Sequence, residues 1–468
     1  MIDKFAKYIP DVQKPTQQMV SFNTKLKWTL LILVIYFVLT LVPLFGLPAQ
    51  ETERFKMLSI LIGATFGSLL SLGIGPIVTS SIVLQLLVGA EIVKIDMTSE
   101  DGRKKFQALQ KVLSVIFIFL EGAIYVFLGG LTAAKFYDPA SASFISNFVE
   151  GAVELSASQI TSLKILLFVQ VCIGGFLVML MDDLLSKWGF GSGISLFIVA
   201  GVSRTIFIET FSWLRITGGE YYDGALLAIF QALSKGDVAV VLSNSLRIIF
   251  TLVVFAASVF LQALKIEIPL APGRVRGFAI RWPLNFIYTS NIPVILTATL
   301  LANVSMVLGL IGRFTNQALD QFSVYFSGPN VVGALINNSF TTMLLIAALT
   351  YLVLMVGGSI LFSLFWVKTS GMDPKSQANQ ILSSGLQIPG FRRDSKILER
   401  MLSRYIWPLT VMGGASVGLL AALADMTNAL SRGTGILLSV MIVYKLYEDI
   451  TKQHLNEMNP AVRKFIKG

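Results

Sequence analysis

The chain has 468 residues, of which 54% are hydrophobic and only 14% are charged, and its mean hydropathy is +0.73. A soluble domain of this length carries about a quarter charged residues, so the composition excludes an ordinary soluble protein and predicts a polytopic membrane protein. The single cysteine, Cys172, excludes an intrachain disulfide and a zinc site built from cysteines.

Ten apolar segments are long enough to cross a hydrocarbon core of about 30 Å, and each is predicted to be a membrane-spanning helix. In chain order they are 27–47, 57–90, 106–134, 160–181, 190–211, 242–264, 282–311, 334–366, 402–425 and 433–450. The first is a retained span, because about two dozen mostly polar residues precede it and no cleavage site is evident. Residues 182–189 join the fourth span to the fifth and leave room only for a turn.

The distribution of Lys and Arg sets the orientation of these spans. With the N-terminus inside, most of the 37 basic residues fall on the inner side, whereas acidic residues occupy the outer loops. Both termini are therefore predicted to be cytoplasmic, in a multi-pass protein of the cell membrane. The net charge of +10 then lies on the inner face, where each basic residue near anionic lipid contributes about 1 kcal/mol.

Two long inner loops, 265–281 and 367–401, combine Gly, Pro and Arg in the stretches APGRVRG and IPGFRRD. Loops of this kind could meet a phosphate-rich partner such as ribosomal RNA. Charge alone favours attraction to lipid and a topological role over that alternative.

Ten spans divide into five and five, and an odd number of spans in each half inverts the second half in the membrane. The predicted parts are a cytosolic N-terminal segment (1–26), a first half (27–211), an external connection (212–241), a second half (242–450) and a cytosolic tail (451–468).

The two halves share short sequence similarities at corresponding spans. GIGPIVTSS at 73–81 resembles SNIPVILTA at 290–298, and GSGISL at 191–196 resembles GTGILL at 433–438. Four matched irregular starts favour inverted repeats with interrupted helices around a shared cavity. Ordinary kinks packed among neighbouring helices are the alternative.

Pro76 and Pro293 mark two of these interruptions. Proline suits the first turn of a helix, and the residue before it is disfavoured in helical geometry, so a helix is predicted to start near each proline. Backbone groups freed by the interruption need water or protein, because lipid cannot bond them. The hydroxyl residues Thr79, Ser80 and Ser81 therefore indicate a wet or protein-lined centre.

The positions that follow the interruptions are branched aliphatics rather than ligands for an ion. They are Ile74, Val78, Ile194, Ile198, Ile295 and Leu438. A ring of such side chains can close a narrow pore by dewetting without binding a solute. Taken one at a time, each is better explained as ordinary helix core.

Two other classes of function were weighed. A secondary transporter also uses inverted repeats but needs ionisable residues near the middle of the membrane, and Glu121 is the one clear carboxylate within a span. Asp182 and Asp183 lie at a helix end, where a solvated structural role is expected. An intramembrane enzyme is disfavoured, because the sequence has no HExxH, no GxSxG and no membrane histidine.

Seven stretches in this order resemble the SecY family of large subunits of Sec protein-conducting channels, over essentially the whole chain. They are LGIGPIVTSSIVLQLLVG (72–89), FGSGISLFIVAGVS (190–203), EIPLAPGRVRG (267–277), SNIPVIL (290–296), GMDPKSQA (371–378), GFRR (390–393) and GTGILL (433–438). The similarity is closer to the archaeal and eukaryotic form than to the bacterial one. It implies an all-α fold of ten transmembrane helices, in two inverted halves that form a clamshell around a central pore.

The resemblance also implies roles for particular residues. The six aliphatics above match the family's pore ring. The plug, a short helix that blocks the outer funnel at rest, matches about 55–68, with Phe55, Leu58, Ile60, Leu61, Ile62 and Phe66 as its apolar residues. The polar cluster of the lateral gate matches Thr79, Glu121 and Asn303. The ribosome-docking positions match Arg274, Arg276 and Arg392.

The implied function is translocation of secretory polypeptides and sideways release of transmembrane segments into lipid. The implied partners are a SecE-type (gamma) subunit, a small beta subunit, the ribosome with its nascent polypeptide or signal sequence, and membrane lipid. No catalysis, cofactor or metal is expected. Since the chain has no hydrolysis motif, the driving force is expected to come from outside, from translation on a docked ribosome.

Overall fold

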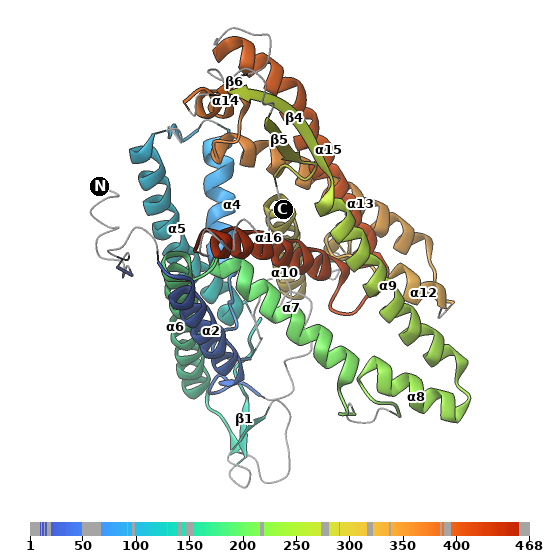
Figure 1. Ribbon diagram of the computed structural model, residues 1–468. Helices are drawn as coiled ribbons and strands as arrows, with labels where there is room; N and C mark the ends of the chain where they lie inside the picture. The colour runs from blue at the N-terminus through green and yellow to red at the C-terminus, as the bar shows by residue number, and fades with distance from the viewer. Residues whose placement is uncertain are drawn as a thin grey trace.

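Long helices dominate the computed structural model (Figure 1). The structure describes residues 10, 12–13, 15, 20–48, 67–90, 92–95, 99–128, 130–138, 143–145, 153–215, 220–272, 280–289, 291–315, 322–336, 338–383, 386–387 and 395–457. Each of the ten predicted spans contains an α-helix within these residues.

The helices of the first half are α2 (Phe22–Leu41), α4 (Gly75–Gly89), α5 (Glu100–Phe127), α6 (Ala157–Trp188) and α7 (Gly193–Phe211). Helix α8 (Ala225–Lys235) follows in the connection. The second half contains α9 (Val238–Ala263), α10 (Ile292–Thr315), η2 (Val324–Phe326), α12 (Val331–Ile336), α13 (Thr342–Thr369), α14 (Pro374–Ser383), α15 (Ser395–Met426) and α16 (Gly433–Glu457).

Eight helices of the described part are long and apolar enough to cross a membrane, namely α2, α5, α6, α7, α9, α10, α13 and α15. Helix α4 is apolar but has only 15 residues, and α16 continues into a charged segment after residue 444. The apolar face of α9 is largely exposed, with Leu252, Val253 and Phe260 each more than half exposed. Such a face is typical of a helix in contact with lipid.

Side-chain caps define several of these helix starts. Ser99 Oγ accepts from the Gly102 amide before α5, and Ser156 forms a capping box with Gln159 before α6. Asp237 accepts from the Val240 amide before α9, and the Thr341 hydroxyl accepts from the Leu344 amide before α13. These groups satisfy amides that have no partner within their own helix.

Three predicted boundaries were wrong. Helix α6 runs to Trp188, so residues 182–188 are helical and the turn to α7 is confined to 189–192. Residues 282–285 lie in a strand instead of a span, because they pair with a strand that precedes them. The span predicted at 334–366 is divided between α12 and α13, where Asn338 takes a positive φ of 51° that a helix does not allow.

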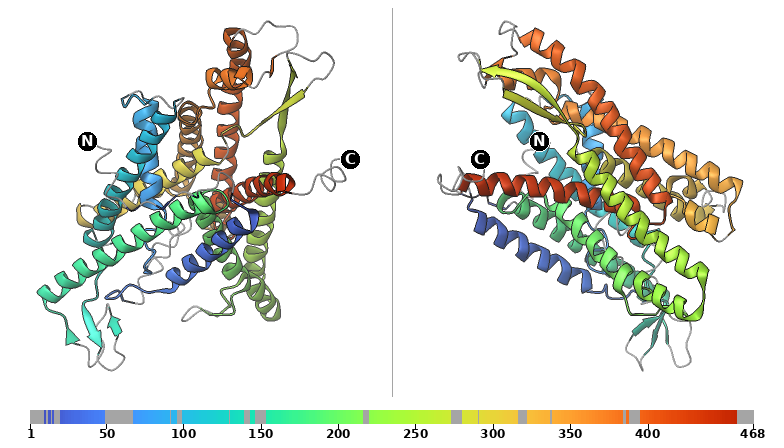
Figure 2. Two further views of the ribbon diagram at one scale, coloured as in Figure 1. Left: turned by 60° about the vertical axis from the view of Figure 1, so that its left-hand side comes forward. Right: turned by 45° about the vertical axis from the view of Figure 1, so that its right-hand side comes forward.

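In the part of the chain that the structure describes, six short strands form two antiparallel sheets outside the helices. Strands β1 (Phe136–Asp138), β2 (Ser143–Ile145) and β3 (Val153–Glu154) have the order β2-β1-β3, and strands β4 (Lys265–Pro272), β5 (Ile280–Asn285) and β6 (Leu386–Gln387) have the order β5-β4-β6. The two sheets lie at opposite ends of the molecule (Figures 1 and 2). The sheet of β4, β5 and β6 lies beside α14 and the first turns of α15 (Figure 1).

The two halves meet along two seams. On one side, α4 packs against α10 and α13, and on the other, α7 packs against α16. Helix α8 contacts both α7 and α9, so it links the last helix of the first half to the first long helix of the second. A continuous core of buried aliphatic and aromatic side chains runs through both halves. This arrangement agrees with the predicted pair of five-helix halves.

Candidate functional site

Four helices begin where the sequence predicted interruptions. Helix α4 starts at Gly75 with Pro76 in its first turn, and α10 starts at Ile292, immediately before Pro293. Helices α7 and α16 start at Gly193 and Gly433. The predicted helix starts are therefore confirmed, and each follows from the proline or glycine at that point.

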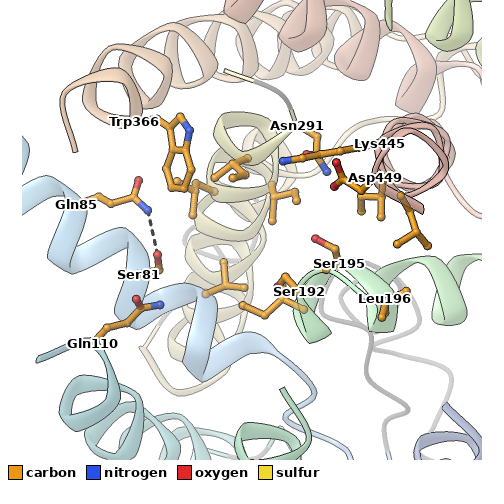
Figure 3. Close-up of a pocket in the computed structure, with 18 of the residues that line it drawn as sticks. Ser81, Gln85, Gln110, Ser192, Ser195, Leu196, Asn291, Trp366, Lys445 and Asp449 are labelled. Atoms are coloured by element: carbon orange, nitrogen blue, oxygen red, sulfur yellow. Dashed lines mark hydrogen bonds between the residues drawn. The ribbon is translucent and has the colours of Figure 1, made fainter. Parts of the chain in front are cut away.

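The three hydroxyl residues after Pro76 take part in three different contacts. Thr79 Oγ1 accepts a hydrogen bond from Asn303 of α10. Ser80 Oγ lies 2.7 Å from Ser114 Oγ of α5. Ser81 lines a cavity, where its hydroxyl accepts from Gln85 Nε2 at 2.9 Å (Figure 3). One turn of α4 thus connects two neighbouring helices and also borders an open space.

This cavity, of about 430 Å³, lies where the four interrupted helices converge (Figure 3). Its apolar lining includes Val78 of α4, Ile194 of α7, Ile295 of α10 and Ile442 of α16. Polar groups from several helices complete it, namely Gln85, Gln110, Ser192, Ser195, Asn291, Lys445 and Asp449. The first turns of α4, α7 and α10 therefore face a shared cavity, which α16 lines further along its length, and this favours that prediction over isolated kinks.

The six predicted ring residues belong to one apolar cluster. Ile74, Val78, Ile198, Ile295 and Leu438 are buried, and Ile194 is partly buried against them. Val78, Ile194 and Ile295 also line the cavity, so this group forms part of its boundary. The ring residues themselves supply no charge and no ligand set for a particular solute, and the charged residues Lys445 and Asp449 lie elsewhere in the lining.

The predicted gate residues are brought together across the seam between the halves. Asn303 Nδ2 donates to Thr79 Oγ1 over 3.1 Å, which links α10 to α4. The Thr79 side chain is also a hydrogen-bonding neighbour of Glu121 on α5. Glu121 is buried, and within the described residues its Oε1 atom has no hydrogen-bond partner.

A second contact across this seam was missed by sequence reasoning. Gly89 of α4 packs so closely on α13 that a Cβ at Gly89 would lie 2.5 Å from Phe365 Cδ1. A glycine at the end of an apolar run carries no local signal of such a contact, because the partner lies in the other half of the chain. Among the described residues, the contacts across the seam thus include a polar one and a close apolar one.

The plug residues Phe55, Leu58, Ile60, Leu61, Ile62 and Phe66 lie outside the described residues. The segment that follows them is held in place. The Leu44 amide donates to Gly67 O at 2.8 Å, and the Leu69 amide donates to Val42 O at 2.9 Å. Leu69 O also lies directly against Gly174 of α6, where the backbone leaves no space for a Cβ.

The docking residues Arg274, Arg276 and Arg392 also lie outside the described residues. The strands beside them join the two long loops, because β4 pairs with β6 through Ala271–Gln387 and Pro272–Leu386. A second apolar core supports these strands and includes Ile268, Leu284, Tyr288, Val367, Ala378, Ile381, Leu398, Leu402, Ile406 and Leu409. The sequence predicted both loops, but not their pairing.

The sequence profile of the SecY family matches residues 68–447. A protein translocase subunit SecY from Methanococcus vannielii is 39% identical over 467 residues, which cover 98% of this chain and 97% of the relative. The SecY subunit of Methanothermobacter thermautotrophicus is 38% identical over 472 residues, which cover 98% and 96% of the two chains.

Solved structures agree with this fold. One, described as a protein conducting channel, matches with a TM-score of 0.81 and 34% identity and covers 99% of this chain and 100% of the other. Sec61 in the canine ribosome–channel complex from the endoplasmic reticulum matches with a TM-score of 0.78 and 34% identity over the same shares. The interrupted helices, their shared cavity and this full-length similarity lead to one conclusion: the chain is a multi-pass membrane protein that belongs to the SecY family.

Proposed function

We propose that this chain forms the channel of a protein translocase, through which unfolded polypeptides cross the membrane and from which apolar segments leave sideways into lipid. The observation that carries the proposal is the convergence of four interrupted helices on a cavity whose lining includes the ring residues Val78, Ile194 and Ile295. A translocating chain presents every kind of side chain, so the place where the pore closes around it needs side chains without charge or ligands, as in the ring. The channel performs no catalysis and uses no cofactor.

The aliphatic ring is proposed to close the pore. Branched side chains at the starts of α4, α7, α10 and α16 belong to one apolar core and would exclude water when no polypeptide is present. They can shift rotamers around a chain of varying width, which keeps the gap beside it too narrow for hydrated ions. In this proposal the segment 55–68 covers the ring on its outer side at rest.

The seam between α4 and the pair α10 and α13 is proposed to be the lateral gate. An interhelical hydrogen bond in a membrane is worth on the order of 1 kcal/mol, so the contact between Asn303 and Thr79 favours the closed state without locking it. A sufficiently apolar segment in the pore gains more than this by entering lipid. The gate therefore sorts segments by hydrophobicity.

The sheet of β4, β5 and β6 is proposed to lie at the cytoplasmic end of the molecule. Both chain termini are proposed to be cytoplasmic as well. The paired loops would present Arg274, Arg276 and Arg392 to the phosphates of a ribosome, which supplies the driving force through translation. A SecE-type subunit and a small beta subunit complete the assembly. The exposed face of α9 is left for lipid or for one of these subunits.

Reconstitution tests the proposal. The chain, purified with its small subunits, is placed in proteoliposomes, and ribosomes translating a secretory polypeptide are added. Import of the polypeptide into a protease-protected space is expected in these vesicles and not in vesicles that lack the chain. Failure to import any polypeptide, together with uptake of a small solute, would contradict the proposal and favour a transporter.

A further inference from the structure

Two aspartates lie at corresponding places in the two halves. Asp182 is on α6, the helix before α7, and Asp425 is on α15, the helix before α16. Helices α7 and α16 are the fifth helices of their halves, and each carries ring residues. In both halves the carboxylate of the preceding helix accepts hydrogen bonds from the first turn of the interrupted helix.

In the first half, Asp182 Oδ1 accepts from the Ile194 amide at 3.0 Å, and the Gly193 amide is a second partner of the same carboxylate. The local residue Ser192 provides no side-chain cap for α7. A carboxylate of the preceding helix thus satisfies amides that helix geometry leaves free.

In the second half, Asp425 is buried and has three contacts with two partners. Its Oδ1 atom accepts from the Thr434 amide at 2.8 Å, and the Thr434 hydroxyl donates to the same carboxylate. Its Oδ2 atom accepts from the Tyr351 hydroxyl of α13 at 2.6 Å. The negative charge also lies at the helix terminus where the backbone dipoles favour it.

A glycine permits the close approach in each half. A Cβ at Gly193 would lie 2.6 Å from Asp182 Cα, and a Cβ at Gly433 would collide with Ala424, the residue beside Asp425. Backbone contact of this kind lets a short aspartate side chain reach the amides of the next helix.

Each capped residue lies one turn before a ring residue. Ile198 follows the capped Ile194 by four residues, and Leu438 follows the capped Thr434 by four residues. Residues four apart lie on one helix face and about 6 Å apart along the axis. A change in the capped turn is therefore transmitted to the ring residue one turn away.

Helix α4, another interrupted helix, starts differently. Backbone hydrogen bonds close the turns before α4, from the Gly73 amide to Leu70 O and from the Gly75 amide to Leu72 O. Among the described contacts, a carboxylate at the start of a ring-bearing helix is found only in the fifth helix of each half.

We infer that Asp182 and Asp425 are matched positioning residues, which fix the height and rotation of α7 and α16 and so hold Ile198 and Leu438 in the closed ring. The inference rests on the proposed function in one respect, because it treats Ile198 and Leu438 as part of the ring that closes the pore. Its test measures the exposure of single ring positions and needs no translocation, so the two proposals can fail separately.

The test uses cysteine labelling in the assembled complex, with Cys172→Ala as background so that one engineered thiol reacts. Ile198→Cys and Leu438→Cys are each combined with Asp182→Ala or Asp425→Ala, and the rate of reaction with a small polar maleimide is measured. Loss of a helix cap shifts a local equilibrium about fivefold. Asp182→Ala is expected to raise labelling about fivefold at position 198 and little at 438, and Asp425→Ala is expected to do the reverse.

Asp237→Ala is the matched control, because Asp237 caps α9, which carries no ring residue. It is expected to change labelling at neither position. Asn is also a good capping residue, so Asp182→Asn and Asp425→Asn are expected to restore most of the protection. Where an alanine variant does not assemble, Thr434→Val removes one donor and is expected to raise labelling at 438 alone. A rise at both positions together, or at neither, would overturn the inference.

Discussion

Asn303 of α10 donates a hydrogen bond to Thr79 of α4, although 224 residues separate them in the chain. This contact joins the two halves of the molecule at the seam proposed as the lateral gate. Because Thr79 also neighbours the buried Glu121, a change on one side of the seam alters the surroundings of a carboxyl group on the other.

Removal of this hydrogen bond is expected to ease lateral opening. Asn303→Leu and Thr79→Val should each lower the hydrophobicity that a segment needs for insertion, by a free energy on the order of 1 kcal/mol. The double variant should add little to either single variant, because both remove the same contact. A graded series of segments in an insertion assay measures the threshold, and Asn244→Leu is the control, since Asn244 bonds only within α9 in the described structure. An unchanged threshold in both single variants would refute the gate assignment.

Glu121 belongs to the same polar cluster, and Glu121→Gln tests it separately. Within the described residues, one oxygen of the buried carboxyl group has no hydrogen-bond partner, and an amide in its place adds donors that can form new contacts with Thr79. The insertion threshold should therefore shift, in the same assay. An unchanged threshold would remove Glu121 from the gate while leaving Asn303 and Thr79 in it.

The close contact between Gly89 and Phe365 predicts a steric effect at the same seam. Gly89→Ala places a methyl group 2.5 Å from the Phe365 ring, so α4 and α13 should separate slightly and resting ion leak should increase. Phe365→Ala should restore closure in the double variant, because it removes the clashing atoms. Electrical recording in planar bilayers measures the leak. Gly357→Ala serves as the control, since a Cβ there meets nothing within 4 Å, and an equal leak in this variant would contradict the interpretation.

The pairing of β4 with β6 predicts that the two basic loops act together. Charge reversal of Arg274, Arg276 and Arg392 to Glu should weaken ribosome binding steeply, and added salt should weaken the wild-type interaction. Co-sedimentation of ribosomes with the reconstituted complex measures both effects. Reversal of the exposed residues Arg103, Lys104 and Lys105 provides the same change in charge elsewhere. If both triple variants lost ribosome binding equally, the result would favour a general attraction to anionic surfaces over a specific role of the two loops.

The connection between the two halves contains a contact that is expected to depend on pH. The Tyr221 hydroxyl donates to Asp237 Oδ2 at 2.9 Å, and this bond, with the Val240 amide on Oδ1, holds the pKa of Asp237 below its ordinary value. Because the pKa of Asp237 is lower in the folded chain, its carboxylate stabilises the cap of α9 at pH values above the unfolded-state pKa of about 3.9. This stabilisation is lost as the pH falls through the lowered pKa of the folded state. Amide exchange at the start of α9, corrected for its intrinsic rate, should accelerate in that acidic range. The same acceleration in Asp237→Asn would show that another group is responsible.

Local chemistry made the interrupted helices predictable from sequence, because Pro76, Pro293 and two glycine pairs determine helix starts by themselves. Residues 282–285 were misread as part of a span, since their apolar character serves a sheet and a second core that only the folded chain brings together. Asp182 was expected to be solvated at a helix end, but it caps the first turn of the next helix, α7. Roles for the gate and ring residues came from family resemblance, because single aliphatics and hydroxyls carry no such signal.

Site-specific photocrosslinking tests most directly whether polypeptides pass through the centre of this chain. A photoreactive residue is placed at Ile74, Ile295 or Leu438, and at Leu252 on the exposed face of α9 as control. Membranes then receive a ribosome stalled with a secretory chain that spans the bilayer. Adducts to the nascent chain at the three ring positions, and none at Leu252, are expected. Adducts at Leu252 alone, or at no position while the chain is still translocated, would contradict a pore through this ring.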